Sequence, residues 1–206
     1  MPSTVSSTDV FQKAFQEHLR IVEALIPQQP TLERIASEMT RAIFAGKKIL
    51  WCGNGGSAAD SQHLAAELMG RFRRERPALP SIALTTDTSI LTAIGNDYGY
   101  EKVFARQVEA LCNQGDVVVG ISTSGNSRNV CSALELARQL GAFTVALSGE
   151  SGGAMMRFAD ATICIPSKDT ARIQEGHILC GHMLCDWIEL SVCAAQPDPV
   201  ATQVTR

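Results

Sequence analysis

Apolar positions first recur along the chain with helical spacing and then gather into short continuous runs. The helical repeat occurs twice before residue 45, on either side of the sequence PQQP, and predicts two helices over about 8–45. Its members are Phe11, Phe15, Leu19, Val22 and Leu25, and then Leu32, Ile35, Met39 and Ile43. Both helices precede every predicted strand.

Five short apolar runs follow, each with the length and composition of a strand buried on both faces. They are KILWC, SIALT, DVVVGIS, FTVALS and ATICIP, with helical patterns near 57–69, 101–113, 126–140 and 171–195. Alternation of strands and helices predicts an α/β fold with a parallel sheet covered on both faces. Such sheets bind ligands outside the carboxyl ends of their strands.

The length of 206 residues and a hydrophobic content of 45% suit one globular domain over 1–206. Within it we expect the α/β core to span about 48–195. The remaining segment, about 195–206, is polar and interrupted by prolines, so we expect a flexible tail.

Charge and cysteine usage narrow the class of protein. The net charge of −3 gives no electrostatic reason to expect nucleic acid or an anionic membrane as a partner. Seven cysteines without a C-x-x-C pair, together with the absence of a signal-peptide pattern, favour the cytoplasm. The arginines of RFRRER (71–76) form a local basic cluster, interpreted either as a solvated loop or as contacts to substrate or another subunit.

Two polar loops follow predicted strands and precede predicted helices. In CGNGG (52–56) the glycines allow a ligand to approach the backbone, and Ser57 occupies the expected N-cap position. In ISTSGNS (121–127) three serines and a threonine surround a glycine. Hydroxyls and free amides at a helix N-terminus favour phosphate binding, although turn and cap chemistry would explain some of them.

His63 and Glu67 stand four residues apart on the helix that follows the glycine turn, so they share one face. A pair of this kind is either a metal-binding pair or an ordinary structural pair, and its spacing does not decide between the two. Gln174 and His182 on the last helix are further candidates, whereas we interpret His177, three residues after Gln174, as a decoy. Glutamine is an uncommon zinc ligand, so spacing alone does not select this set.

Four motifs in order carry a family resemblance: CGNGGSAADSQHLAAEL, LTTDTSILTAIGNDYGYE, GISTSGNS and RIQEGHILCGH. Over about residues 10–193 the chain resembles the phosphoheptose isomerases (sedoheptulose 7-phosphate isomerases) of the sugar isomerase (SIS) domain superfamily. The resemblance implies a three-layer sandwich around a five-stranded parallel, flavodoxin-like sheet. It also implies a homotetramer with its sites at subunit interfaces.

The family pattern, carried over position by position, implies a set of site residues. The implied ligands of one Zn²⁺ per active site are His63, Glu67, Gln174 and His182. The implied contacts to a phosphorylated seven-carbon sugar are Asn54, Gly55, Gly56, Ser57, Glu67, Asn96, Asp97, Ser122, Thr123, Ser124, Ser127 and Gln174, with Arg71 as a further candidate.

The implied reaction converts sedoheptulose 7-phosphate, a ketose, to D-glycero-D-manno-heptose 7-phosphate, an aldose, for activated heptose and surface polysaccharide synthesis. Glu67 is the expected base, His182 the expected acid, and Asp97 is expected to position hydroxyls or assist ring opening. Two alternatives remain: a non-catalytic SIS protein that binds the DnaA replication initiator, and an SIS enzyme for another phosphosugar. The initiator-associating relatives lack the glutamate and the final histidine of the metal set, and this chain has both.

Gln174 and His182 are eight residues apart, which on one straight helix separates their Cα atoms by about 12 Å along the axis. One metal ion with bonds of about 2 Å would not reach both. Either the helix is broken, with Gly176 and Gly181 as weak points, or the two side chains reach a metal from different chains. We expect the second arrangement, since apolar residues from Ile173 to Ile188 suit a helix buried between subunits.

Overall fold

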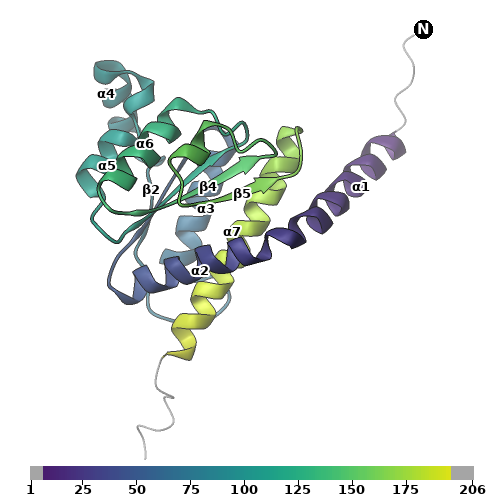
Figure 1. The fold of residues 1–206 in the computed structure, drawn as a ribbon, viewed down its shortest axis with the longest axis horizontal. Helices are drawn as coiled ribbons and strands as arrows, with labels where there is room; N and C mark the ends of the chain where they lie inside the picture. The colour runs from purple at the N-terminus through teal and green to yellow at the C-terminus, as the bar shows by residue number, and fades with distance from the viewer. Residues whose placement is uncertain (1–6, 196–206) are drawn as a thin grey trace, which may run out of the picture.

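The computed structural model describes residues 7–195 and shows a parallel sheet between two layers of helices (Figure 1). The strands are β1 (Ile49–Gly53), β2 (Ser81–Ala83), β3 (Val117–Ser122), β4 (Phe143–Gly149) and β5 (Ala161–Ile165). The α-helices are α1 (Ser7–Leu25), α2 (Gln29–Phe44), α3 (Gly56–Met69), α4 (Thr88–Tyr98), α5 (Ala105–Leu111), α6 (Arg128–Gln139) and α7 (Thr170–Ala194). Short 3₁₀ turns are η1 (Ile26–Gln28), η2 (Tyr100–Lys102) and η3 (Ala154–Arg157). The expected α/β sandwich is confirmed, and the expected tail lies, beyond residue 195, outside the described residues.

The strand order is β2-β1-β3-β4-β5, and every neighbouring pair is parallel. The chain therefore reverses its direction of winding between β1 and β3, which makes this pair the topological switch point of the sheet. Gly53 at the end of β1 pairs with Ile121 near the end of β3. The loops that follow these two strands consequently open side by side, where sheets of this type bind ligands.

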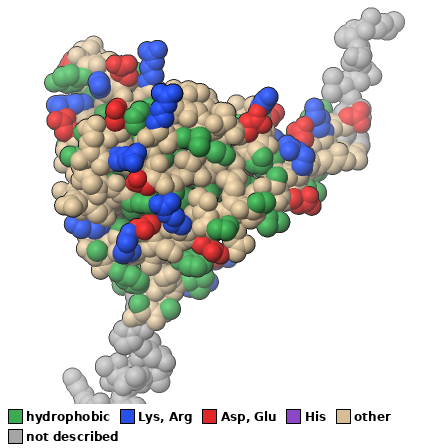
Figure 2. Space-filling view, viewed as in Figure 1, with side chains coloured by type: hydrophobic (Ala, Val, Ile, Leu, Met, Phe, Trp, Pro, Cys, Tyr) green, Lys and Arg blue, Asp and Glu red, His purple; other side chains and the backbone are tan. Residues whose placement is uncertain are grey.

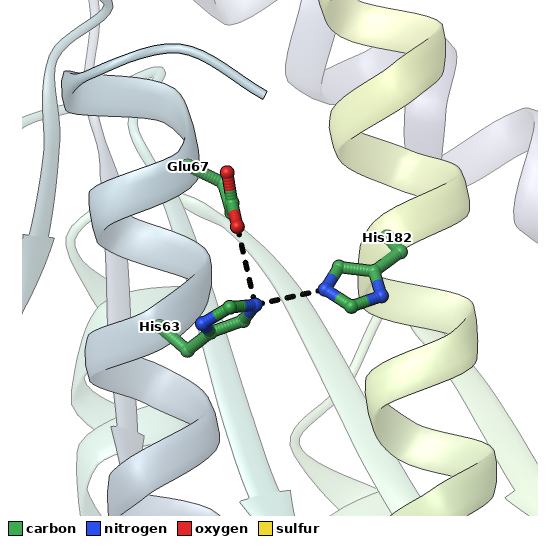
Figure 3. A group of neighbouring side chains, drawn as sticks. All are labelled: His63, Glu67 and His182. Carbon is green, nitrogen blue, oxygen red and sulfur yellow. Dashed lines mark hydrogen bonds and ion pairs between the residues drawn. The ribbon is translucent and has the colours of Figure 1, made fainter. Parts of the chain in front are cut away.

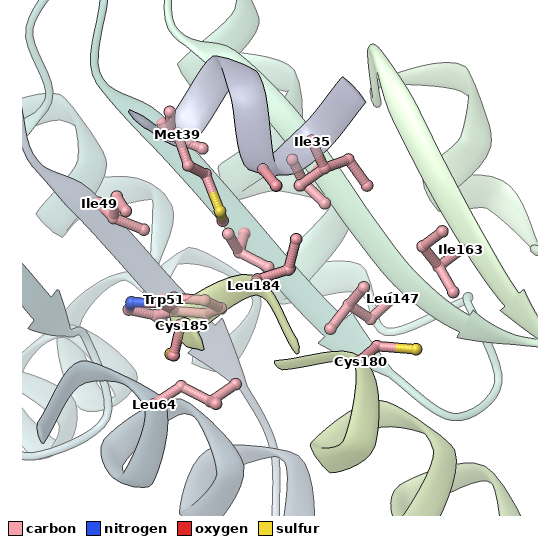
Figure 4. Packing of buried hydrophobic residues seen from close by; sticks show 14 of the residues in the cluster. Ile35, Met39, Ile49, Trp51, Leu64, Leu147, Ile163, Cys180, Leu184 and Cys185 are labelled. Carbon is pink, nitrogen blue, oxygen red and sulfur yellow. The ribbon is translucent and has the colours of Figure 1, made fainter. Parts of the chain in front are cut away.

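Two hydrophobic cores cover the two faces of the sheet. One joins the sheet to α2, α3 and α7 and includes Trp51, Leu64, Leu147 and Leu184, all essentially inaccessible to solvent (Figure 4). The other packs α5 and α6 against the opposite face, through residues such as Phe104 and Leu134. Because β1 and β3 are buried along their whole length, their ends hold the site loops on a rigid base.

The helices depart from the sequence prediction in three places. The PQQP segment does not separate the first two helices widely, because η1 links α1 to α2 and Pro30 falls in the first turn of α2, where no amide donor is needed. Helix α4 was not predicted as an element. The helix predicted near 101–113 is divided into η2 and α5.

Helix α1 projects away from the body of the chain (Figure 1). The first part of its apolar stripe is open to solvent, since Phe11, Phe15 and Leu19 are 64%, 71% and 62% exposed, whereas Leu25 at its end is buried in the core with α2 and α7. The amphipathic pattern therefore predicted the helix correctly, but only the C-terminal end of its stripe packs inside the chain.

The surface carries no extended field of one charge on the face shown in Figure 2, where basic and acidic side chains are mixed. Among the helices of residues 7–195, none combines the length and the apolar character that crossing a membrane requires.

Candidate functional site

Three side chains with metal-ligand chemistry meet between α3 and α7 (Figure 3). His63 Nε2 lies 2.8 Å from His182 Nε2 and 3.2 Å from Glu67 Oε1. Each residue offers one ligand atom, and these three atoms lie within 4.8 Å of one another. His63 is exposed and the other two are half-buried, so small molecules can reach the cluster from solvent.

Helix packing brings these residues, 119 positions apart in sequence, to one place. Leu64 of α3 lies directly against Gly181 of α7, where an added Cβ would come within 2.5 Å of the leucine side chain. The small residue lets the two helices approach closely. The neighbours His63 and His182 are consequently at the same level on facing surfaces. The i, i+4 spacing on α3 then adds Glu67 to the same patch.

Gln174 does not join this cluster within the chain. Helix α7 is continuous from Thr170 to Ala194, so the broken-helix alternative is excluded. The amide of Gln174 packs instead on the first turn of α3, where a Cβ on Gly56 would come within 2.1 Å of Gln174 Nε2. The chain thus brings together three of the four expected ligands, and the fourth faces the glycine turn.

Local electrostatics favour a neutral imidazole at position 182. Burial lowers the pKa of His182, and the neighbouring positive groups His63 and Arg73 lower it further, against an opposing effect of Glu67. One turn before His63, burial raises the pKa of Asp60 to about 6, although the proximity of His63 opposes this shift. A neutral imidazole has a free lone pair, which is the form that binds metal ions.

The glycine turn (52–56) is attached through a pair of amides to the first turn of α6, which follows the serine loop (121–127). Asn54 Nδ2 donates to Asn129 Oδ1 at 2.9 Å, and Asn129 Nδ2 donates to Asn54 Oδ1 at 2.8 Å. The Tyr100 hydroxyl donates to the same Asn54 oxygen at 3.3 Å. The sequence prediction missed both partners: Asn129 stands outside the four motifs, and Tyr100 stands in the second motif but was not singled out.

The predicted N-cap role of Ser57 is wrong. The cap residue of α3 is Gly55, with φ of 58°, and the helix begins at Gly56. Ser57 is buried in the first turn, and its carbonyl accepts a hydrogen bond from the Ser61 hydroxyl at 2.8 Å. A positive φ at the cap favours glycine over serine, which explains why the cap lies two residues before the predicted one.

The hydroxyls of the serine loop converge at the start of α6. Ser122 Oγ lies 2.8 Å from Ser127 Oγ and 3.4 Å from Ser124 Oγ. Ser127 occupies the N-cap position of α6, yet its hydroxyl makes no capping hydrogen bond within the described residues. Gly125 has φ of +66°, and a Cβ there would come within 2.2 Å of the Gly152 carbonyl oxygen, so only glycine suits this turn. The loop therefore offers hydroxyls beyond those that cap chemistry uses.

Other candidates lie apart from the three-residue cluster. Asn96 and Asp97 are exposed near the end of α4, and Asn96 Nδ2 donates to Asp97 Oδ1 at 2.8 Å. Thr123 is half-buried, and its carbonyl accepts from the Gly149 amide. Arg71 is exposed and lies 3.9 Å from Glu75.

The basic cluster is not simply a solvated loop. Arg73 and Arg74 form ion pairs with Asp186 of α7 at 3.1 and 2.6 Å. Arg76 is buried, and its guanidinium lies 3.4 Å from the buried Glu189 carboxylate. The sequence could not show this, because the acidic partners stand more than 110 positions away.

His177 is a buried structural residue. Its Nε2–H donates to the Ser148 carbonyl at 3.1 Å, and Nδ1 has no hydrogen-bond partner within residues 7–195. Burial lowers the pKa of His177 to about 4, although the bond to Ser148 opposes this shift. Of the two histidines on α7, only His182 faces the cluster.

The donor set fits a divalent metal such as zinc. Two imidazole nitrogens and one carboxylate oxygen form a ligand set found in catalytic zinc sites, which leave a further position for water or substrate. The cluster is open to solvent on the side of His63, which such a position requires.

Comparisons with known proteins show the family to which the chain is related. Residues 11–149 match the family model described as SIS domain. The chain is 55% identical over 170 residues to the phosphoheptose isomerase of Akkermansia muciniphila, covering 82% of this chain and 90% of the relative. The corresponding Aquifex aeolicus protein is 54% identical over 184 residues, covering 89% and 95%. The solved structure of phosphoheptose isomerase GmhA from Neisseria gonorrhoeae superposes with a TM-score of 0.84 at 43% identity, covering 90% of this chain and 100% of that one.

Proposed function

This chain belongs to the phosphoheptose isomerase family of SIS-domain proteins, and we propose that it carries out the family reaction at the cluster of His63, Glu67 and His182 with the help of a bound divalent metal. It is a ketose–aldose isomerase that converts sedoheptulose 7-phosphate to D-glycero-D-manno-heptose 7-phosphate. The observation that carries the metal proposal is the meeting of three ligand atoms within 4.8 Å of one another in a patch open to solvent.

The reaction moves a proton between two adjacent carbons through an enediol-like intermediate, so it needs a base near C1 and C2. Glu67 is the best candidate, because its carboxylate is half-buried in the cluster and the cluster is open to solvent at His63. The lowered pKa of His182 favours a neutral ring at pH 7. This supports a ligand role for His182 more strongly than the acid role that the resemblance implies.

His63, Glu67 and His182 would hold the metal, and when bound it supplies Lewis-acid polarisation of the substrate carbonyl. The residues around them orient the sugar. Asn54, held by Asn129 and Tyr100, presents its amide at the mouth of the switch point. Asn96 and Asp97 remain proposed contacts to the sugar hydroxyls.

The serine loop is the proposed phosphate cradle. Ser122, Ser124 and Ser127 gather their hydroxyls at the N-terminus of α6, where the helix dipole favours an anion. Binding the C7 phosphate there holds the remote end of the sugar, so that its binding energy orients the reacting carbons.

A homotetramer is the proposed assembly. The exposed stripe of α1 continues into an apolar groove between α1, α2 and α7, with a volume of about 400 Å³, lined by residues such as Val22, Leu179 and Trp187. The α7 pattern also has two faces: Ile173, Leu184 and Ile188 are buried in the chain's own core, whereas Met183 and Trp187 are about two-fifths exposed. Apolar surface of this extent supports burial against further copies of the chain.

The position of Gln174 supports active sites that are shared between subunits. It lies on an unbroken helix about 12 Å along the axis from His182. We propose that the Gln174 side chain serves the cluster of a neighbouring subunit.

The proposed location is the cytoplasm, and the proposed pathway is activated heptose synthesis for surface polysaccharide. All seven cysteines are free thiols. Burial raises the pKa of the Cys52 and Cys180 thiols to about 12, so these two are unreactive parts of the core.

An enzyme assay separates this proposal from its alternatives. The chain, stripped of metal with a chelator, is incubated with sedoheptulose 7-phosphate before and after the addition of Zn²⁺. We expect heptose 7-phosphate to form only after metal is added. Full turnover by the stripped protein would contradict the metal proposal, whereas no turnover in either state, together with binding to the DnaA initiator, would favour the non-catalytic alternative.

A further inference from the structure

Glu189 is a buried carboxylate that organises the segment between α3 and β2. It accepts hydrogen bonds from three successive backbone amides: Phe72 N at 2.9 Å, Arg73 N at 2.8 Å and Arg74 N at 2.9 Å. The residue is fully buried, and burial alone would raise its pKa. The three amide donors and Arg76 outweigh that effect, so the pKa is lowered and the group is ionised.

This carboxylate lies on the same helix face as a residue of the metal cluster. Glu189 follows His182 on α7 by seven residues, which is two helical turns. Asp186, one turn after His182, holds the side chains of Arg73 and Arg74. Segment 72–76 therefore covers the face of α7 that runs from His182 to Glu189.

The segment places an aromatic ring on His182. The Phe72 and His182 rings are stacked, with centroids 5.3 Å apart and an interplanar angle of 23°. The guanidinium of Arg73 covers the same phenyl ring at 4.9 Å. One edge of the imidazole therefore faces His63, while one of its faces is in contact with Phe72.

The other end of the segment is tied to the helix that carries the remaining cluster residues. Buried Arg76 donates to the carbonyl oxygens of Glu67 at 2.8 Å, Leu68 at 2.8 Å and Gly70 at 3.0 Å. It therefore satisfies the carbonyls left free at the C-terminus of α3. Its ion pair with Glu189 links this helix end directly to α7.

We propose that segment 72–76 is a clamp between α3 and α7, in which Phe72 is a positioning residue that fixes the ring of His182 and Glu189 anchors Phe72. The inference rests on the proposed metal site and extends it. Outer contacts that hold a ligand ring in place contribute to metal affinity, because a freely rotating imidazole loses more entropy on binding. A buried ion pair that only supported the fold would not require an aromatic ring stacked on His182.

The test is the Zn²⁺ affinity of the full chain after metal stripping, measured by competition with a fluorescent chelator. The variant is Phe72→Leu, which keeps an apolar side chain but removes the ring. A matched control is Phe143→Leu, since Phe143 is likewise half-buried against the same core and covered by a guanidinium, that of Arg34 at 5.7 Å. Phe72→Tyr restores the ring, and His182→Gln reports the proposed site itself.

We expect Phe72→Leu to weaken Zn²⁺ binding about 10- to 100-fold, while Phe72→Tyr and Phe143→Leu stay near the wild type. Glu189→Gln should weaken binding in the same direction; if that variant fails to fold, Phe72→Leu decides alone. A Phe72→Leu affinity within about twofold of the wild type, with His182→Gln strongly weakened, would overturn the clamp and leave the metal site standing. No effect of His182→Gln would overturn both.

Discussion

The pH dependence of stability tests the assignment of His177 as a structural residue. Its Nδ1 faces no acceptor within the described residues, so protonation would bury a charge and an unpaired donor together. Burial lowers the pKa to about 4 from the ordinary 6.5. Between these two values the unfolded chain binds a proton that the folded chain does not. As far as His177 affects it, the free energy of unfolding therefore has its full value above pH 6.5 and decreases as the pH falls toward 4.

The magnitude follows from these two pKa values. At pH 5 the unfolded imidazole is almost fully protonated and the folded one almost fully neutral, so the loss relative to pH 7 is about 2 kcal/mol. The substitution His177→Gln keeps an N–H that can donate to the Ser148 carbonyl but removes the titrating group. The variant should therefore lack this part of the pH dependence.

The assay is urea unfolding of both proteins at pH 7 and pH 5, with chelator present and one protomer concentration throughout, because assembly affects apparent stability. We expect the wild type to lose about 2 kcal/mol more than the variant between the two pH values. Parallel losses in the two proteins would refute the reasoning, because His177 would then titrate alike when folded and unfolded.

Three further predictions concern the site. Combining Ser122→Ala with Ser127→Ala should weaken binding of sedoheptulose 7-phosphate much more than binding of unphosphorylated sedoheptulose. The expected loss of binding free energy is about 1–3 kcal/mol per lost hydrogen bond to the charged group. Equal losses of affinity for the two sugars in calorimetry would exclude the phosphate cradle. Gly56→Ala should displace the Gln174 amide, because Gln174 Nε2 would lie 2.1 Å from the added Cβ. We expect it to lower turnover as much as Gln174→Ala does, with little change in the urea midpoint of unfolding. Unchanged turnover would show that Gln174 does not take part in catalysis. Mixing Gln174→Ala and His63→Ala subunits under conditions that allow subunit exchange should restore activity. Some of the mixed sites would combine an intact cluster from one chain with an intact glutamine from the next. Proven exchange without recovery of activity would place the whole site in one chain.

The sequence predicted the parts of the fold that depend on local pattern. All five apolar runs became strands, because a strand buried on both faces needs a continuous apolar run. Helix α4 was missed because its apolar pattern is short: Leu91 and Ile94 pack partly buried against the second core, and none of its residues is fully buried. The stripe of α1 was visible, but a stripe does not tell whether its partner is the same chain or another.

The site residues that the sequence predicted are likewise those that depend on local pattern. His63 and Glu67 were recognisable as a pair because four residues make one helical turn. Their meeting with His182 depends on how closely α3 approaches α7 at Leu64 and Gly181, which no local pattern encodes. Glu189 and Phe72 were not found for a related reason, since 117 positions separate the carboxylate from the amide that it binds.

The central claim is that Glu67 moves the proton in the isomerisation, and solvent isotope incorporation tests it most directly. Sedoheptulose 7-phosphate is incubated in D₂O with the metal-loaded wild type or with Glu67→Gln, and deuterium at C1 and C2 is followed by NMR, with binding of the phosphosugar checked separately. This role of Glu67 predicts deuterium incorporation by the wild type and a rate roughly 10²- to 10⁴-fold lower in the variant, which still binds the sugar. Incorporation by Glu67→Gln within about tenfold of the wild-type rate would contradict it.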